Sequence, residues 1–268
     1  MAMKTLHELH RPLGSTGIKV SPIGLGTVKI GRDQGVKYPT QFTIPNDDEV
    51  KKLLRTAREL GINTLDTAPA YGNSEQRLGE LLTDREQWII VSKAGEEFIN
   101  GSSSFDFSVA HIISSIERSL KRLQTDYIDV LLIHSDGNDL SIVNNLELWD
   151  TLKELKQRGL IRSFGLSGKT VEGGIKALQH SDCAMVTFNL KEQSEKAVLD
   201  YAAENNKGIF IKKALASGHV CANTDKSPVE ASFDLVFSQP AVSSAIVGTI
   251  NLHHLKQNVD VAIACLIK

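Results

Sequence analysis

Residues 88–134 carry the pattern that decides the fold: WIIVSK (88–93) and IDVLLIH (128–134) are short apolar runs, with VAHIISSIERSLKRL (109–123) between them. Both runs are too short for helices and are apolar on both faces, as strands of a helix-covered parallel sheet are. The segment between them repeats its apolar residues with the period of an α-helix. This stretch therefore predicts a strand–helix–strand unit with parallel strands.

The same alternation extends along the chain in both directions. Runs rich in β-branched residues recur at Ile23–Gly26, Ile62–Thr67, Trp88–Lys93, Ile128–His134, Ile161–Gly165, Ala184–Asn189, Gly208–Lys212 and Ser244–Val247. Segments of helical period include Asp47–Leu60, Val109–Leu123, Val143–Gln157, Ser194–Asn205 and Leu252–Ile267. The spacing is about 31 residues per strand–helix unit, the size of a βα repeat. Eight such units predict an α/β fold, a (β/α)8 TIM barrel, with an open doubly wound sheet as the alternative.

The segment before the first of these strands has a different pattern. Arg11–Leu13 and Ile18–Val20 flank the turn GSTG (14–17), which predicts an N-terminal β-hairpin that plugs one end of the barrel. No low-complexity tract or linker rich in proline, glycine and serine interrupts the chain, so residues 1–268 are expected to form a single domain.

Charge and composition restrict the possible partners. The chain has 30 Lys and Arg against 32 Asp and Glu, a net charge of −2, which gives no electrostatic footprint for nucleic acid or an anionic membrane. No run approaches the ~18 apolar residues of a membrane span. Cys183, Cys221 and Cys265 are odd in number and far apart, as in a reducing compartment. We expect a cytoplasmic protein whose partner is a small molecule; the oligomeric state stays open.

Three consecutive apolar runs end in an ionisable residue: Asp66, Lys93 and His134. Tyr71 follows Asp66 by five residues. Taken singly, each has an ordinary structural role, such as capping a turn or reaching solvent. In a barrel, however, the carboxyl ends of the strands share one rim, which is where such enzymes place their chemistry. A carboxylate, an ammonium, an imidazole and a phenol gathered there can protonate a carbonyl oxygen as it gains negative charge.

Five segments give the chain a family resemblance. LDTAPAYGNSE (65–75), IIVSKAG (89–95) and DYIDVLLIH (126–134) resemble the aldo-keto reductases, as do RPLGSTGIKVSPIGLGT (11–27) and IVGTINLHHLKQNV (246–259). The resemblance covers nearly the whole chain, from about residue 11 onward.

The resemblance implies a reaction and four catalytic residues, Asp66, Tyr71, Lys93 and His134. Hydride would pass from NADPH to the carbonyl carbon of a small aldehyde or ketone. Tyr71 would be the proton donor, Lys93 paired with Asp66 would lower the pKa of that phenol, and His134 would orient the carbonyl oxygen. No metal takes part in this scheme.

It also implies cofactor contacts along the rim, at Gly26, Thr27, Asp66, Ser167, Lys212, Leu215, Ser217, Gly248, Thr249, His254 and Asn258. Four positions depart from the family pattern. Gly168 and Met185 stand where the family has amide side chains that contact the nicotinamide carboxamide. Lys212 stands where an aromatic ring stacks on the nicotinamide, and His254 where an arginine grips the 2′-phosphate.

Three segments are expected to shape the substrate pocket: Val28–Pro45, Gly95–Ser108 and Ser135–Asn138. The first two contain aromatic residues, among them Tyr38 and Phe98, and a partly aromatic pocket suits small aldehydes.

Two other functions remain as alternatives. A lysine at the end of a barrel strand can act as a nucleophile, so a Schiff-base aldolase using Lys93 is one. The other is a nucleotide-binding regulatory subunit that keeps the fold and a residual activity.

Overall fold

The computed structural model describes residues 5–36, 38, 41–218 and 226–268. Eight parallel strands form a closed barrel in the order β10-β11-β12-β3-β4-β5-β8-β9. They are β3 (Ile23–Gly26), β4 (Thr64–Asp66), β5 (Ile89–Ala94), β8 (Ile128–His134), β9 (Ile161–Ser167), β10 (Cys183–Thr187), β11 (Gly208–Lys212) and β12 (Val242–Val247). The ring closes where Ala245 of β12 pairs with Ile23 of β3. The predicted (β/α)8 barrel is confirmed.

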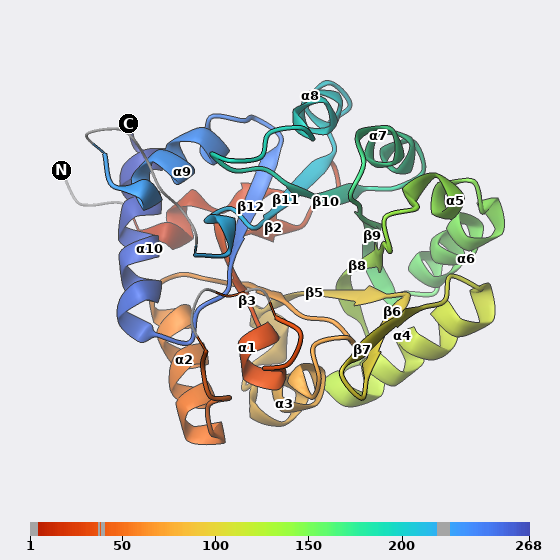
Figure 1. Ribbon diagram of the computed structural model, residues 1–268, viewed down its shortest axis with the longest axis horizontal. Helices are drawn as coiled ribbons and strands as arrows, with labels where there is room; N and C mark the ends of the chain where they lie inside the picture. The colour runs from red at the N-terminus through yellow and green to blue at the C-terminus, as the bar shows by residue number, and fades with distance from the viewer. Residues whose placement is uncertain (1–4, 37, 39–40, 219–225) are drawn as a thin grey trace.

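Helices surround this barrel (Figure 1). The α-helices are α1 (Val28–Gly31), α2 (Asp47–Glu59), α3 (Ser74–Leu81), α4 (Val109–Leu123), α5 (Asp139–Val143), α6 (Leu146–Gln157), α7 (Val171–His180), α8 (Lys196–Glu204), α9 (Pro228–Phe237) and α10 (Leu252–Leu266). Short 3-10 helices are η1 (Leu6–Leu9), η2 (Arg85–Gln87) and η3 (Ala216–Gly218).

The helix α2 shows how local sequence sets an element. The Asn46 side chain accepts a hydrogen bond from the backbone of Glu49, and the Glu49 side chain accepts one from the backbone of Asn46. This reciprocal cap satisfies two donors that a helix start leaves unpaired. The apolar residues of one helical face, such as Val50 and Leu54, are buried against the barrel.

One predicted helix is interrupted. Val143–Gln157 was expected to be continuous, but α5 ends at Val143 and α6 starts at Leu146. The Asn145 side chain accepts a hydrogen bond from the backbone of Leu148 and so caps a new helix start. Asparagine favours such caps over helix interiors because its side chain competes for backbone hydrogen bonds.

The N-terminal hairpin plugs the barrel, as predicted. In it β1 (Arg11–Pro12) pairs antiparallel with β2 (Lys19–Val20). Leu13, Ile18 and Val20 are buried together with strand residues such as Phe210 and belong to a cluster that contains no helix residue. Since strand side chains alternate between the two faces, this cluster is the barrel interior, and the larger cluster lies between the strands and the helices.

A second hairpin, which the sequence analysis did not predict, lies in a segment expected to shape the pocket. Within Gly95–Ser108, strand β6 (Glu96–Ile99) pairs antiparallel with β7 (Ser102–Phe105). Asn100 and Gly101 connect them with positive φ angles of 52° and 81°. Asn-Gly is the sequence that favours this two-residue turn, so the hairpin could have been predicted from it.

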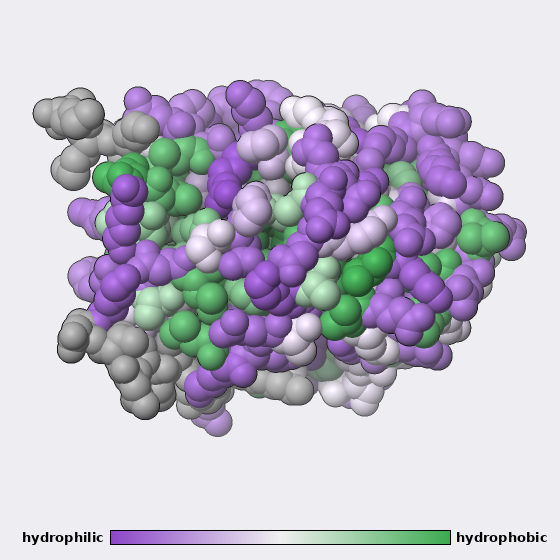
Figure 2. All heavy atoms as spheres, turned by 90° about the horizontal axis from the view of Figure 1, so that it is seen from above, coloured by the Kyte–Doolittle hydropathy of each residue, from purple (hydrophilic) through white to green (hydrophobic). Residues whose placement is uncertain are grey.

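The face seen in Figure 2 is mainly polar. Figure 2 shows apolar side chains in small groups among hydrophilic ones. Within the described residues, no helix combines the length and apolarity needed to cross a membrane. Cys183 and Cys265 are free thiols, and Cys221 lies outside the described residues.

Candidate active site

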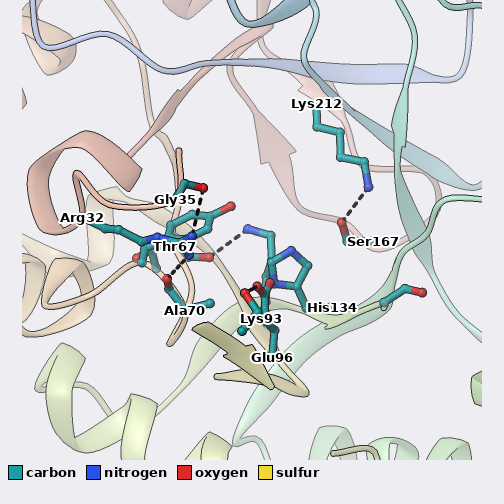
Figure 3. A network of polar contacts seen from close by, with 12 residues as sticks. Arg32, Gly35, Thr67, Ala70, Lys93, Glu96, His134, Ser167 and Lys212 are labelled. Carbon is teal, nitrogen blue, oxygen red and sulfur yellow. Dashed lines mark hydrogen bonds and ion pairs between the residues drawn. The ribbon is translucent and has the colours of Figure 1, made fainter. Parts of the chain in front are cut away.

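Neighbouring strands of the barrel bring the predicted charged groups together (Figure 3). Asp66 ends β4 and Lys93 lies near the end of β5, and both side chains are almost completely buried. Lys93 Nζ lies 2.5 Å from Asp66 Oδ1 and also donates to the carbonyl oxygen of Thr67 at 2.9 Å. A buried charge is tolerated when it is paired and hydrogen-bonded, and this pair satisfies both conditions.

Tyr71 reaches the same pair from the turn that follows β4. Its hydroxyl donates to Asp66 Oδ2 at 3.4 Å, and its ring centroid lies 4.7 Å from Lys93 Nζ. The His134 ring, at the end of β8, lies edge-on to Tyr71 with 6.4 Å between the centroids. The four side chains thus form one cluster at the carboxyl end of the barrel.

The electrostatics of Tyr71 differ from the expectation that Lys93 lowers its pKa. Burial, followed by the charge of Asp66, raises the pKa of Tyr71 well above its usual range. Burial is the main cause of the higher pKa, and the Asp66 oxygen that faces the phenol adds to it, while the other Asp66 oxygen engages the ammonium of Lys93. In this structure the phenol is therefore held protonated.

Glu96 is a site residue that the sequence reasoning missed. Its Oε2 lies 2.8 Å from His134 Nδ1, and its Oε1 accepts a hydrogen bond from Ser103 at 2.6 Å. Burial opposes ionisation of Glu96, but His134, Ser103 and the charge of Arg32 lower its pKa to about 2. Burial lowers the pKa of His134, and Glu96 opposes that shift. A carboxylate this close to Nδ1 favours a proton on that nitrogen.

Arg32 ties the loop after α1 to this cluster. Its guanidinium carbon lies 3.3 Å from the centre of the Phe98 ring. It donates to the carbonyl oxygens of Ala70, at 2.9 Å, and of Gln34, at 2.7 Å. Since Ala70 precedes Tyr71, this arginine anchors the turn that carries the phenol.

A cavity of about 1160 Å³ extends from the four clustered residues along the rim of the barrel. Asp66, Tyr71 and His134 line one end. Most of the expected cofactor residues also line it: Gly26, Asp66, Lys212, Leu215, Gly248, Thr249, His254 and Asn258. Lys169 and Glu195, which the sequence reasoning did not single out, are part of the wall.

Two expected cofactor residues are engaged in the framework instead and are not among the lining residues. Thr27 is buried, donates to the carbonyl oxygen of Asp66 at 2.9 Å and accepts from Ser74 at 2.7 Å, so it holds the end of β4. The buried Ser167 hydroxyl accepts a hydrogen bond from Lys212 Nζ at 3.2 Å. Ser217 lies in η3, next to Gly218 of the cavity wall.

The residues present fit a dinucleotide. The cavity reaches the start of α10, where Thr249 and His254 line it and Asn258 follows one turn later. The positive end of a helix dipole and short polar donors suit a phosphate. Met185, which stands where the family has an amide side chain, is buried in the barrel interior and does not line the cavity.

No metal-binding group of three or more His, Cys, Asp or Glu side chains occurs within the described part of the chain.

A carboxylate–ammonium pair beside a phenol and an imidazole, at one end of a long cavity, is suited to acid–base chemistry at a carbonyl oxygen. Residues 22–230 match the Aldo/keto reductase family, and the chain belongs to this family. It is therefore an oxidoreductase that uses a nicotinamide cofactor and acts on a small-molecule carbonyl substrate.

Three similar proteins illustrate the range of the family. A crystal structure from Pseudomonas aeruginosa, of a protein assigned to the aldo-keto reductases, is 59% identical, with 98% of this chain and 97% of that chain covered and a TM-score of 0.89. L-galactose dehydrogenase of Arabidopsis thaliana is 38% identical over 82% of this chain and 68% of the relative. NADH-specific methylglyoxal reductase of Escherichia coli is 31% identical over 72% of this chain and 60% of the relative.

Proposed function

We propose that the protein is an NADPH-dependent reductase of small aldehydes or ketones, with Tyr71 as the proton donor and residues 1–268 acting as one cytoplasmic domain. The observation that supports this proposal most directly is the cluster of Asp66, Tyr71, Lys93 and His134 at one end of the long cavity.

The roles of the four residues follow from their geometry. His134 lies edge-on to Tyr71, so a carbonyl oxygen placed between them receives the phenol proton while the imidazole orients it. Lys93, fixed by Asp66, provides positive charge 4.7 Å from the phenol ring and so stabilises the phenolate left after proton transfer. When bound, the reduced nicotinamide supplies the hydride.

Support for NADPH over NADH comes from the far end of the cavity. Thr249, His254 and Asn258 surround the start of α10, where a 2′-phosphate gains short polar donors and the helix dipole. None of these residues is an arginine. The preference for NADPH over NADH is therefore expected to be smaller than in a site where an arginine binds the 2′-phosphate with two hydrogen bonds. Because the E. coli relative is named as NADH-specific, the affinities of this protein for NADPH and NADH need to be measured side by side.

The geometry weakens the aldolase alternative. Attack on a carbonyl needs a free amine, and Lys93 is engaged by Asp66 and by the carbonyl oxygen of Thr67. Borohydride treatment in the presence of an aldehyde is therefore expected to leave Lys93 unmodified.

The experiment is a screen of NADPH oxidation over a panel of aldehydes and ketones, with parallel fluorescence titrations of NADPH and NADH. We expect turnover of at least one small carbonyl compound and a lower dissociation constant for NADPH. Equal constants, or tighter binding of NADH, would contradict the cofactor preference. Nucleotide binding without turnover of any carbonyl compound would favour the regulatory alternative.

A further inference from the structure

Lys212 is a cation in the cavity to which the reaction outlined above gives no role. It ends β11, and its Nζ donates to the carbonyl oxygen of Gly168 at 2.6 Å and to Ser167 Oγ at 3.2 Å. Both acceptors are neutral, and within the described residues Lys212 forms no ion pair. Its positive charge is therefore not cancelled by a contacting carboxylate.

The position of Lys212 in the barrel is opposite the catalytic cluster. In the ring of eight strands, β11 lies four strands from β5, which carries Lys93. Figure 3 shows Lys212 beside Ser167, across from Lys93 and His134. The Lys212 ammonium contacts Ser167, and Ser167 pairs with His134 in the barrel. A planar ring whose reacting carbon approaches a carbonyl held by Tyr71 and His134 therefore comes close to this ammonium.

We propose that Lys212 makes the cavity discriminate between the two redox states of the nicotinamide, favouring the reduced, uncharged ring over the oxidised, cationic ring. This inference rests on the proposed function. Two like charges a few ångström apart repel strongly in a partly buried site, and at an effective dielectric constant of ~20 the penalty corresponds to a tenfold or larger loss of affinity. The reduced nucleotide avoids this penalty because its ring carries no charge.

The charged surroundings of Lys212 make the discrimination depend on pH. Burial lowers the pKa of Lys212 to about 8; Lys213 and Lys93 also lower it, whereas Glu195 and Asp139 oppose the shift. The charge of Lys212 acts in turn on His134. Asp139 is occupied by the backbone N–H groups of Lys169 and Thr170.

Glu195 is the acidic group with the largest influence. Its Oε2 accepts from the backbone of Thr187 at 2.7 Å, while its Oε1 is buried without a partner among the described residues. Burial raises the pKa of Glu195, which disfavours the carboxylate that would offset Lys212. As pH rises through the pKa of Lys212, the ammonium becomes a neutral amine. The affinity for NADP⁺ then increases while that for NADPH stays nearly constant.

The test compares the dissociation constants of NADP⁺ and NADPH by fluorescence and calorimetric titration, at about pH 6.5 and about pH 9.5, on either side of that pKa. In the wild type we expect NADPH to bind tenfold or more tightly than NADP⁺ at the lower pH, and the ratio to shrink at the higher pH. Titration of the 2′-phosphate affects both nucleotides and cancels in the ratio. NAD⁺ and NADH are measured in the same way, so the ratio is available for whichever pair binds.

Three variants isolate the charge of Lys212. Lys212→Met is expected to bring the ratio close to one at both pH values. Lys212→Arg keeps a charge that does not titrate, so its ratio is expected to stay high at about pH 9.5. Lys213→Met removes an exposed charge from the same cavity and is the matched control at about pH 6.5, where Lys212 is charged in both proteins and the ratio should stay close to that of the wild type.

The outcomes separate the inference from the proposed function. Equal ratios in the wild type, Lys212→Met and Lys212→Arg at both pH values would overturn the inference alone. A wild-type protein that binds neither nucleotide pair would overturn the proposed function together with it.

Discussion

At the scale of single residues, Tyr71 carries the mechanism. Tyr71→Phe removes the proton donor and leaves the shape of the site nearly intact. Because general acid catalysis is worth about 10²–10⁴-fold, kcat should fall at least that far while nucleotide affinity stays near the wild-type value. Single-turnover NADPH oxidation with one reactive aldehyde measures the effect. Tyr127→Phe removes a hydroxyl from a half-buried tyrosine beside Arg85, outside the cavity wall, and should have no effect.

Lys93 sharpens this prediction. Lys93→Met removes the cation paired with Asp66, so the carboxylate charge next to the phenol is no longer offset and the pKa of Tyr71 rises further. The loss of rate should be comparable with that of Tyr71→Phe. If Tyr71→Phe kept most of the wild-type rate, the proton would have to come from another group.

At the scale of secondary-structure elements, the β6–β7 hairpin delivers Glu96 to His134. Glu96→Gln removes the charge that opposes the effect of burial, so the pKa of His134 should fall further. The ring also loses the carboxylate that lies 2.8 Å from Nδ1, and removing such a partner from a metal-binding histidine costs about 10–100-fold. We therefore expect a lower kcat/KM and an acid limb that moves to lower pH.

The measurements are pH profiles of kcat/KM and titration of the His134 ring by NMR. Glu97→Gln is the matched control, because Glu97 lies in the same strand but contacts Arg118 and His111 instead. An unchanged His134 titration in Glu96→Gln would show that the 2.8 Å contact does not control the imidazole.

The arrangement of the elements also explains which site residues could be predicted from the sequence. Asp66, Lys93 and His134 could be found because parallel strands place their carboxyl ends on one rim, so position along the chain determines position in space. Glu96 could not be paired with His134 without the hairpin register, which the Asn100–Gly101 turn encodes. The framework role of Thr27 depends on a contact with Ser74, 47 residues away, which no local pattern reports.

At the scale of the whole molecule, the barrel separates stability from chemistry. The plug residue Leu13 packs against Gly208 at the start of β11, and Lys212 ends the same strand at the cavity. At ~3.3 Å per residue these two strand ends lie about 13 Å apart, beyond the ~7–10 Å within which substitutions usually couple. The two ends of the barrel should therefore respond independently.

Leu13→Ala tests this separation. Because Leu13 is completely buried, its truncation leaves a cavity in the barrel interior and should lower the free energy of unfolding by about 2–5 kcal/mol. The matched control is Leu146→Ala at an exposed position, which should change stability by no more than about 0.5 kcal/mol.

Nucleotide affinity and the single-turnover rate of Leu13→Ala should stay at wild-type values. In the double variant with Tyr71→Phe, the changes in stability should add within about 0.5 kcal/mol. Urea unfolding and single-turnover kinetics on the wild type, the two single variants, the double variant and the control measure both quantities. A coupling clearly above that limit would mean that the plug and the catalytic rim act as one unit.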